Sequence, residues 1–523
     1  MLKTPPDSPV EASDLTDLRL LFTAEEAFPA LERAFLEAKS EIWASFRVFD
    51  LETKLRSEEG RAVGDDWFDL LVHVLTKGVS VHMALSDFDP ILKTKLHNAS
   101  WKARRMFIGA EEVAPPDAKL NVLNATHSAR VGILPRLLIW PGLIRRLNRR
   151  AGLLNAMSAE DRERELECSP GLVRWLRYLP GGTLVARKWP APPLVPGTHH
   201  HKIAVFDRSE LYIGGLDLDE RRYDDPEHER SREETWHDVQ MMCRGTVAEE
   251  GQRHLETFLQ VCNGRVDPPP PGRLLRTLSR RRRIQFPFLS PRPVVEELLE
   301  AHLRMIKDAR RLIYLETQFF RDRRISGALA EAARRHSDLG LILVLPGAPE
   351  DVAFDGAMSS DARFGEYLQA KCVDEVAEAF GPRAAICSPV RPRRLPASGR
   401  DTLCGSPIIY VHAKVGMFDD DRAIISSANL NGRSLSWDTE AGVALDGPEQ
   451  VAPLRDRAFR HWLGKDAEST FYDISVAPGH WRARAKSNAE RPPEKRQGFL
   501  VPYDPEPARA FGRPLPGIPD AMV

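Results

Sequence analysis

The strongest constraint on the fold of this chain is an internal duplication. When positions 200–221 are aligned with positions 412–433 without a gap, seven residues are identical. The identical pairs are His200 and His412, Lys202 and Lys414, Phe206 and Phe418, Asp207 and Asp419, Ile213 and Ile425, Leu218 and Leu430, and Arg221 and Arg433. Two further pairs join related residues, Gly215 with Ser427 and Asp217 with Asn429. Chance does not produce such a match, so we expect two copies of one structural unit.

The sequence around each motif alternates between helix and strand patterns. A capping box at Thr23-x-x-Glu26 begins an amphipathic helix, which the strand Ile42–Phe49 follows. The alternation continues with helix Trp67–Thr76, strand Val79–Leu85, helix Val294–Ala309, strand Leu312–Phe320, helix Leu329–His336 and strand Leu341–Leu345. Each motif runs into a short apolar strand, Ile203–Phe206 or Val415–Phe418. The sequence therefore predicts an α/β fold of two tandem sandwich halves, related by a pseudo-twofold axis and joined in one bilobed catalytic unit.

The duplication also divides the chain. We expect an N-terminal lead at residues 1–19, a first half at 20–265 and a second half at 291–470, each half with one motif. Residues 266–290 are predicted to be a linker, because Pro268–Pro271 favour an extended connector and a run of arginines follows at Arg280–Arg283. Residues 471–523 are rich in proline and arginine without clear periodicity, which predicts an extended C-terminal tail.

Composition restricts the compartment and the partners. The 523 residues carry a formal net charge of -1, so any attraction to nucleic acid or an anionic membrane must be local. The six cysteines show no C-x-x-C pair, as is typical of free thiols in a reducing compartment. The N-terminus lacks the apolar core of a secretory signal, and no apolar run is long enough to span a membrane. We expect a cytoplasmic protein that can contact a membrane peripherally, while export by a signal-less route stays open.

Two His-x-Lys pairs on strands are suited to phosphodiester chemistry. Because side chains alternate along a strand, His200 and Lys202 share one face, as do His412 and Lys414. If the pseudo-twofold axis brings the two faces together, two imidazoles and two ammonium groups meet in one small volume. The lysines would balance phosphate charge while one imidazole attacks phosphorus and the other protonates the leaving alkoxide. This chemistry requires no metal and no cofactor.

Further polar residues would support the two histidines. An imidazole that acts as a nucleophile needs an acceptor on its second nitrogen. Asp238 is the candidate for His200, and Glu440, 28 residues after His412, is the candidate for His412. From these residues alone, either histidine can be the nucleophile. The candidates for the phosphate site are Ser427 and Asn429 as hydrogen-bond donors, Gly215 as a point of close backbone approach, and Asp217 as the counterpart of Asn429.

Four segments spread over roughly residues 20–470 resemble the phospholipase D superfamily, in particular its eukaryotic-type members. They are His199–Leu218, Trp236–Asp238, Tyr314–Phe320 and Val411–Glu440. The resemblance implies a bilobed α/β fold with one active site between the lobes and a covalent phosphohistidine intermediate. It also implies that His200 is the nucleophile, that His412 is the general acid, and that Asp207 and Asp419 support the site from outside the reacting groups.

Three positions depart from the family pattern: His201 stands where glutamine is common, Ser426 replaces a glycine, and Thr317 replaces an asparagine. None of these changes removes a catalytic group, and alternation points His201 away from the site. The run His199–His201 could suggest a metal site. Adjacent histidines on a strand point to opposite faces, however, so the three cannot easily share one ion, and we expect no metal.

The segment Arg130–Arg150 combines six arginines with many apolar residues and Trp140. Pro135, Pro141 and Gly142 are expected to break any long helix there. Such a segment fits a piece lying in a lipid headgroup layer, near the mouth of the active site. The alternative is a lid or core helix pair with a solvated arginine face. Arg280–Arg283 are predicted to be a solvated linker face, with attraction to anionic lipid as the second interpretation.

These observations predict a phospholipase D-like phosphodiesterase that cleaves the distal phosphodiester of glycerophospholipids to phosphatidic acid, with transphosphatidylation as a further activity. The expected partner is a phospholipid at a membrane surface. The first alternative is a cardiolipin-synthase-like phosphatidyltransferase, although the usual N-terminal membrane spans are not present in this sequence. A nuclease is disfavoured by the neutral charge and the lack of a basic stripe with aromatic residues. A catalytically inactive scaffold is disfavoured by the intact motifs.

Overall fold

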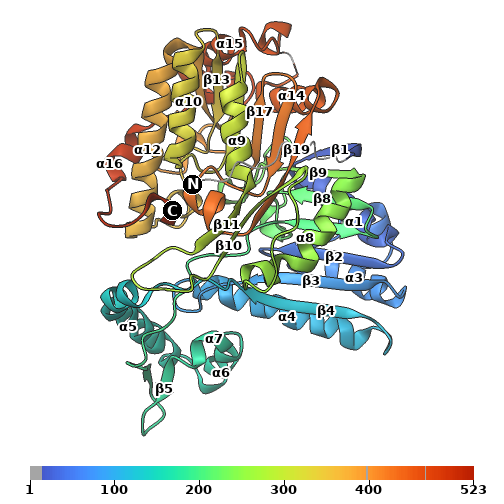
Figure 1. The fold of residues 1–523 in the computed structure, drawn as a ribbon, viewed down its shortest axis with the longest axis vertical. Coiled ribbons are helices and arrows are strands. Elements are labelled where there is room, and N and C mark those ends of the chain that lie inside the picture. The colour runs from blue at the N-terminus through green and yellow to red at the C-terminus, as the bar shows by residue number, and fades with distance from the viewer. Residues whose placement is uncertain (1–13, 396–398, 466) are drawn as a thin grey trace.

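Two large mixed β-sheets flanked by helices form the described part of the chain, residues 14–395, 399–465 and 467–523 of a computed structural model (Figure 1). The first sheet has the order β1-β9-β8-β7-β2-β3-β4. Its strands are β1 (Thr16–Phe22), β2 (Glu41–Phe46), β3 (Ser80–Asp87), β4 (Leu120–Thr126), β7 (Ile203–Phe206), β8 (Glu210–Gly214) and β9 (Val239–Arg244). The second sheet has the order β11-β10-β19-β18-β17-β12-β13-β14-β20. Its strands are β10 (Leu274–Arg280), β11 (Arg292–Glu296), β12 (Leu312–Thr317), β13 (Gly340–Val344), β14 (Ala384–Pro389), β17 (Lys414–Phe418), β18 (Arg422–Ser426), β19 (Glu440–Asp446) and β20 (Leu500–Pro502).

The two sheets share one topology. Seven strands of the second sheet, from β10 through β19, β18, β17, β12 and β13 to β14, repeat the order of the first sheet. The directions agree as well, because β2 and β12 each pair parallel with the strand on one side and antiparallel with the motif strand on the other. An isolated bridge between Phe49 and Leu218 has its counterpart between Phe320 and Leu430. The α/β class and the duplication are confirmed.

The main core lies between the two sheets. Buried residues from β7, β8 and β9 pack in one cluster with their counterparts from β17, β18 and β19, for example Ile203, Ile213 and Met241 with Val415, Ile425 and Val443. Helices α8 (Thr246–Cys262) and α14 (Pro448–Leu463) contribute to the same cluster. The outer faces are covered by α1 (Thr23–Glu37), α3 (Trp67–Thr76) and α4 (Thr94–Val113) in the first half, and by α9 (Glu297–Asp308), α10 (Arg323–Arg335) and α12 (Ser360–Phe380) in the second.

The bounds of the elements follow the sequence patterns closely, with two informative differences. The strands predicted to run to Phe49 and Phe320 end three residues earlier, at Phe46 and Thr317, where the chain leaves each sheet beside the motifs. The capping box at α1 forms only in part. Phe22 is the N-cap and its backbone amide donates to the Glu26 carboxylate, whereas the Thr23 hydroxyl is buried without a partner among the described residues.

Two segments predicted to be linker and tail belong to the second half. Within the predicted linker 266–290, Leu274–Arg280 forms β10, the counterpart of β1. Within the predicted tail 471–523, α15 (Ala477–Glu490) buries Trp481 in the main core and β20 extends the sheet edge beside β14. The prediction of an extended tail was therefore wrong. Its anchoring residues are too widely spaced to produce a periodic pattern. The short helix α16 (Glu506–Phe511) packs against α12.

A small subdomain is inserted between β4 and β7 and projects from the sheets at the bottom of Figure 1. It contains α5 (Ile133–Asn155), α6 (Ala159–Glu167), α7 (Pro170–Val173), β5 (Leu176–Tyr178) and β6 (Leu184–Ala186). The predicted break in α5 was wrong: Pro135 lies in the first turn, where no backbone donor is needed, and Pro141 is tolerated inside the helix. No helix in the described residues is long and apolar enough to cross a membrane.

Candidate active site

The two motifs meet at the interface between the halves. Each histidine lies just before its motif strand, and the backbone of the opposite half holds it there. The His200 amide donates to the Thr439 carbonyl over 2.8 Å, and the His412 amide donates to the His237 carbonyl over 2.8 Å. This cross-pairing explains why both histidines reach one site, although 212 positions separate them in the sequence.

Each histidine is held by a carboxylate from the opposite half. His200 Nδ1 lies 2.9 Å from Glu440 Oε1, and His412 Nδ1 lies 2.6 Å from Asp238 Oδ2. The pairing expected from the sequence, Asp238 with His200 and Glu440 with His412, was therefore wrong. Glu440 begins β19 and Asp238 precedes β9, and these are the segments that cross the interface. Proximity along the chain misled the prediction.

Both lysines are buried beside the histidine of their own motif. Lys202 Nζ donates to the His200 carbonyl and lies 3.8 Å from Asp217 Oδ2, and Lys414 Nζ donates to the His412 carbonyl. Burial lowers the pKa of Lys202 to about 8 and that of Lys414 to about 7. A phosphate anion between these ammonium groups would stabilise their charged forms.

The buried surroundings favour the neutral form of both imidazoles. Burial lowers the pKa of His200 and His412 well below the usual value, and the neighbouring lysine of each motif lowers it further. Because Nδ1 of each ring faces a carboxylate, the lone pair of the neutral ring is on Nε2. Such a ring can attack phosphorus. An incoming phosphate would raise the pKa of both rings, which favours the protonated form that a general acid needs.

The residues predicted to bind phosphate have different structural tasks. A Cβ atom at Gly215 would lie 2.4 Å from Asp238 Oδ1, so glycine makes room for this carboxylate. The Ser427 hydroxyl donates to Glu440 Oε2, which orients the carboxylate of His200. Asn429 is buried and its Oδ1 has no protein partner, so of these three residues it alone keeps polar capacity for a ligand.

The motif aspartates lie at the far ends of the motif strands. Asp207 accepts hydrogen bonds from the backbone amides of Lys39, Ser40 and Glu41 at the start of β2. Asp419 accepts the equivalent bonds from Arg310, Arg311 and Leu312 at the start of β12. They anchor neighbouring strands and do not contact the site, in agreement with a support outside the reacting groups.

The positions that depart from the family pattern leave the site intact. His201 points away from the catalytic groups, with its ring nitrogens 2.7 Å from Ser45 Oγ and 3.0 Å from His254 Nε2. The Thr317 hydroxyl donates to the Phe319 carbonyl, and Ser426 Oγ accepts from the Ala428 amide. Both hydroxyls therefore stabilise the local loops.

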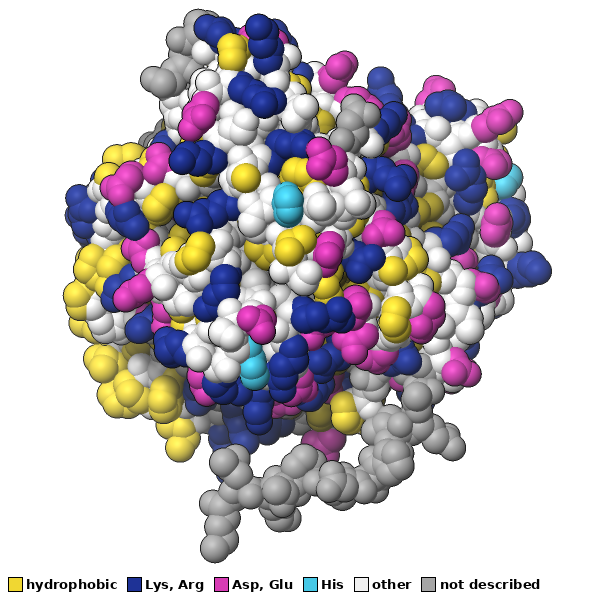
Figure 2. All heavy atoms as spheres, turned by 90° about the horizontal axis from the view of Figure 1, so that it is seen from above, with side chains coloured by type: hydrophobic (Ala, Val, Ile, Leu, Met, Phe, Trp, Pro, Cys, Tyr) yellow, Lys and Arg dark blue, Asp and Glu magenta, His cyan; other side chains and the backbone are white. Residues whose placement is uncertain are grey.

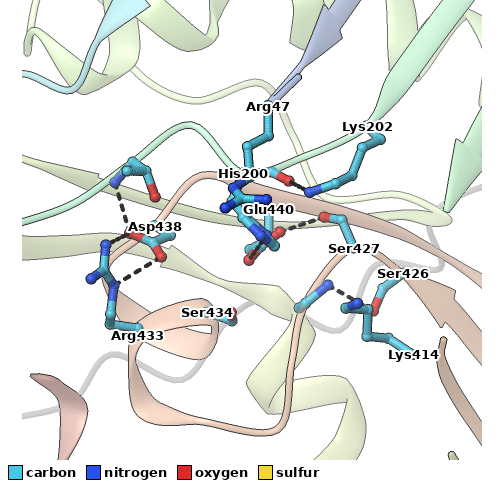
Figure 3. Close-up of polar contacts among 12 residues, drawn as sticks. Arg47, His200, Lys202, Lys414, Ser426, Ser427, Arg433, Ser434, Asp438 and Glu440 are labelled. Carbon is cyan, nitrogen blue, oxygen red and sulfur yellow. Dashed lines mark hydrogen bonds and ion pairs between the residues drawn. The ribbon is translucent and has the colours of Figure 1, made fainter. Parts of the chain in front are cut away.

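Several basic residues near the site were not anticipated. In Figure 3, Arg47 lies close to His200, and its guanidinium is 3.7 Å from Asp217 Oδ2. Arg222 is buried and donates to the same carboxylate. Asp217 thus balances cations and is not a phosphate ligand. No motif marked Arg47, and the repeat marked Arg221, whose side chain instead pairs with Glu350.

The site combines two histidines, two lysines and two carboxylates from the repeated halves, and each carboxylate holds the histidine of the opposite half. Such a site, built from two His-x-Lys motifs, defines a phosphodiesterase or phosphatidyltransferase centre. Comparison with known proteins agrees. The family model "Cardiolipin synthase, PLD-like domain" matches residues 302–462, which include the second motif. The second half of the chain therefore carries a domain of the phospholipase D superfamily.

The relatives are distant. Phospholipase D1 of Saccharomyces cerevisiae is 24% identical over 378 residues, which cover 52% of this chain and 22% of the yeast protein. Phospholipase D alpha 1 of Oryza sativa subsp. japonica is 21% identical over 368 residues, which cover 48% of this chain and 45% of the rice protein. The chain thus spans less than half the length of these relatives. Among solved structures, phosphatidylserine synthase from Haemophilus influenzae Rd KW20 matches with a TM-score of 0.49 and 12% identity, covering 91% of this chain and 95% of that one.

Proposed function

We propose that the protein is a phospholipase D-like phosphodiesterase that cleaves the distal phosphodiester of glycerophospholipids and releases phosphatidic acid. The observation that carries the proposal is the pair of histidines, each oriented by a carboxylate of the opposite half and flanked by a buried lysine. No other ionisable groups are needed for a two-step displacement at phosphorus.

The two histidines have different roles in this reaction. His200 Nε2 attacks phosphorus and the bond from phosphorus to the headgroup oxygen breaks, while protonated His412 transfers its proton to the leaving alkoxide. Neutral His412 then removes a proton from water, which attacks phosphorus and releases phosphatidic acid and free His200. An alcohol in place of water yields a phosphatidyl alcohol. The greater exposure of the His200 side chain, 14% against 3% for His412, supports His200 as the nucleophile.

A second candidate function is phosphatidyl transfer of the cardiolipin synthase type. It uses the same site with a lipid alcohol as acceptor, and the family model that matches the second half supports it. A nuclease is supported less well. The face shown in Figure 2 intersperses lysines and arginines with acidic side chains, whereas a nucleic-acid groove requires a continuous basic stripe.

The inserted subdomain presents an apolar surface that suits a membrane. Leu143, Leu147 and Leu154 pack the C-terminal part of α5 onto the subdomain core, but the N-terminal part has no such cover. The loop at residues 284–288 adjoins this end, because the Gly132 amide donates to the Phe288 carbonyl over 2.8 Å. We name this surface the apolar patch; its exposed residues are Ile133, Leu134, Leu137, Leu138, Ile139, Ile284, Phe286 and Phe288.

Arginines surround the apolar patch. Arg136 belongs to the same helix, and Arg281, Arg282 and Arg283 precede the loop residues of the patch. Exposed apolar side chains beside basic residues are the combination with which peripheral proteins bind anionic bilayers. We infer that the apolar patch docks the enzyme on its lipid substrate, which extends the expectation for Arg130–Arg150 to a second segment of the chain.

A transphosphatidylation assay tests the proposed activity. Purified protein in EDTA is incubated with vesicles of phosphatidylcholine or phosphatidylethanolamine in the presence of ethanol, alongside a His200→Ala variant. We expect phosphatidic acid and phosphatidylethanol from the wild type alone, because in the proposed reaction both products form from the phosphatidyl adduct on His200. Absence of product from every lipid tested would contradict the proposal and direct the search to other phosphodiesters.

The docking role of the apolar patch is tested separately. A Leu138→Asp/Ile284→Asp variant should lose roughly tenfold in vesicle binding and vesicle hydrolysis, because it places two charges where acyl chains are expected. Hydrolysis of a short-chain monomeric phospholipid should be unchanged. Val113→Asp, at an equally exposed apolar residue on α4, is the matched control. Equal vesicle binding by all three proteins would refute docking whether or not the lipid is a substrate.

A further inference from the structure

Three histidines gather beside the segment that carries Asp238. They are His228 in the loop after β8, His237 just before β9, and His461 in α14, so both halves contribute. One ring nitrogen from each lies within 4.8 Å of one nitrogen of each of the others. The side chains of His228 and His237 have no solvent exposure.

Two of these rings are held from behind by carboxylates. His228 Nδ1 lies 2.6 Å from Asp224 Oδ2, which leaves Nε2 facing His461 Nε2 at 3.0 Å. His237 Nε2 lies 2.5 Å from Glu316 Oε1. A carboxylate behind an imidazole is the arrangement that metal-binding histidines commonly show, because it fixes the tautomer and increases the donor strength of the free nitrogen.

The polar groups of the cluster are incompletely satisfied by the protein. His237 Nε2 is paired with Glu316 Oε1, whereas His237 Nδ1 is buried and has no hydrogen-bond partner among the described residues. Leaving this nitrogen unpaired costs about 1–3 kcal/mol. Neutral imidazoles present lone pairs, and a divalent cation is a partner that satisfies several of them at once.

We propose that His228, His237 and His461 bind a structural divalent transition-metal ion, with zinc as the preferred ion. Imidazole nitrogens suit zinc, and the largely buried setting, with His228 and His237 buried and His461 partly buried, is typical of a structural site. Glu316 stays behind His237 as the carboxylate that fixes the tautomer of its ring. The ion would join the two halves, since His461 belongs to the second and the other two ligands to the first.

The ion would stabilise the segment that positions His412, the proposed general acid, without contacting the phosphate. The His237 carbonyl accepts from the amides of His412 and Ala413, and the neighbouring Asp238 holds His412 Nδ1. Fixing the His237 ring therefore fixes the segment that positions His412. This role is compatible with a reaction that uses no metal at phosphorus.

A second trio, His127, His199 and Cys262, offers a control for the experiment. Its ligand atoms are also close together, but they have protein partners. His127 Nδ1 accepts from the Ala129 amide over 3.1 Å, and His199 Nδ1 lies 2.8 Å from Thr439 Oγ1. We therefore expect no ion there, although the two trios are comparably buried.

Metal content of the intact chain tests the proposal. Protein produced in zinc-supplemented medium and exchanged into metal-free buffer should contain about one zinc ion per chain by elemental mass spectrometry. His461→Gln should lose the ion, and Cys262→Ser should retain it. Replacement of zinc by cobalt should give the visible absorption bands of a nitrogen-coordinated tetrahedral ion in the wild type, a readout that requires no variant to fold.

The thermal midpoint gives the second measurement. Removal of the ion by a strong chelator should lower the midpoint of the wild type and leave that of His461→Gln unchanged, because binding to the folded state alone stabilises it. A wild type without stoichiometric metal after incubation with zinc and gel filtration would overturn the proposal, as would full zinc retention by His461→Gln. Both outcomes are independent of whether the enzyme acts on lipids.

Discussion

The two halves contribute the same groups to one site, but they hold the carboxylates Asp238 and Glu440 by different contacts. In the first half, Gly215 leaves space for the short side chain of Asp238, which the backbone amide of Val239 also holds. In the second half, the equivalent position is Ser427, whose hydroxyl donates to the longer side chain of Glu440. The duplicated unit has thus kept the contact between carboxylate and histidine. In one half a glycine makes space for the carboxylate, and in the other a serine hydroxyl binds it. The consequence is that one carboxylate holds each histidine, and the two histidines are free to specialise.

The largest expected effect concerns that specialisation. His200→Ala and His412→Ala should each lower the turnover of a natural phospholipid by about 10⁴-fold or more, because each removes a group that acts at the reacting centre. A substrate with an activated leaving group separates the two variants. It needs no general acid, so His412→Ala should still release the leaving group in a burst, while His200→Ala should not.

The phosphoenzyme should show the same asymmetry. Rapid quenching of His412→Ala in an alkaline denaturant, which preserves the acid-labile P–N bond, should trap a phosphohistidine, and peptide mapping should place it on His200. A burst from His200→Ala with the adduct on His412 would reverse the assignment of roles and leave the crossed architecture intact.

The crossed carboxylates give the next largest effect. Glu440→Gln and Asp238→Asn should each lower turnover by roughly 10²–10³-fold, because the imidazole loses the acceptor that fixes its tautomer. A double-mutant cycle tests the pairing. In a His412→Ala background assayed by burst formation with the activated substrate, Asp238→Asn should cost little, whereas Glu440→Gln should cost its full amount. The opposite pattern would restore the pairing expected from proximity along the chain.

The difference between the expected and the observed pairing of carboxylates with histidines shows which part of the site could be derived from the sequence. The repeat identifies both His-Lys pairs, because identical residues at identical spacing require identical backbone surroundings. Proximity along the chain, rather than the repeat, supplies Asp238 and Glu440 as the candidate carboxylates. It cannot show which histidine each one holds, since that depends on how the segments before β9 and β19 cross the interface.

Other features lie beyond sequence patterns for equally physical reasons. Arg47 has no motif, because its position follows from where β2 ends. Strand β20 and Trp481 were hidden in a segment rich in proline and arginine, since a few well-placed apolar residues can anchor a chain without periodicity. The α5 helix survives Pro141 because one missing hydrogen bond costs less than the packing of its buried stripe contributes.

Smaller effects are expected from changing the residues that hold the two carboxylates, Gly215 and Ser427. Gly215→Ala should lower turnover by roughly tenfold to a hundredfold, since the new methyl group displaces Asp238 and tilts His412. Ser427→Ala should cost only about threefold to tenfold, because it removes one hydrogen bond to Glu440 and creates little strain. The Michaelis constants should change little in both variants. Equal losses in kcat would mean that the positions of Asp238 and Glu440 are equally sensitive to these substitutions, which would contradict the expected difference.

The smallest expected effect lies in the pH dependence and again separates the halves. The pKa is about 8 for Lys202, near Asp217, and about 7 for Lys414, both below the usual 10.5 because burial disfavours the charge. The ammonium form is lost as pH rises through these values, so kcat/KM should fall on an alkaline limb that begins near pH 7. Arginine stays charged throughout this pH range. Lys414→Arg should therefore have a lower plateau of kcat/KM, and its alkaline limb should move to higher pH, towards the pKa of Lys202. The limb for kcat should lie higher than that for kcat/KM in the wild type, since bound phosphate stabilises both charges. An alkaline limb that does not move in Lys414→Arg would assign it to another group and remove this difference between the halves.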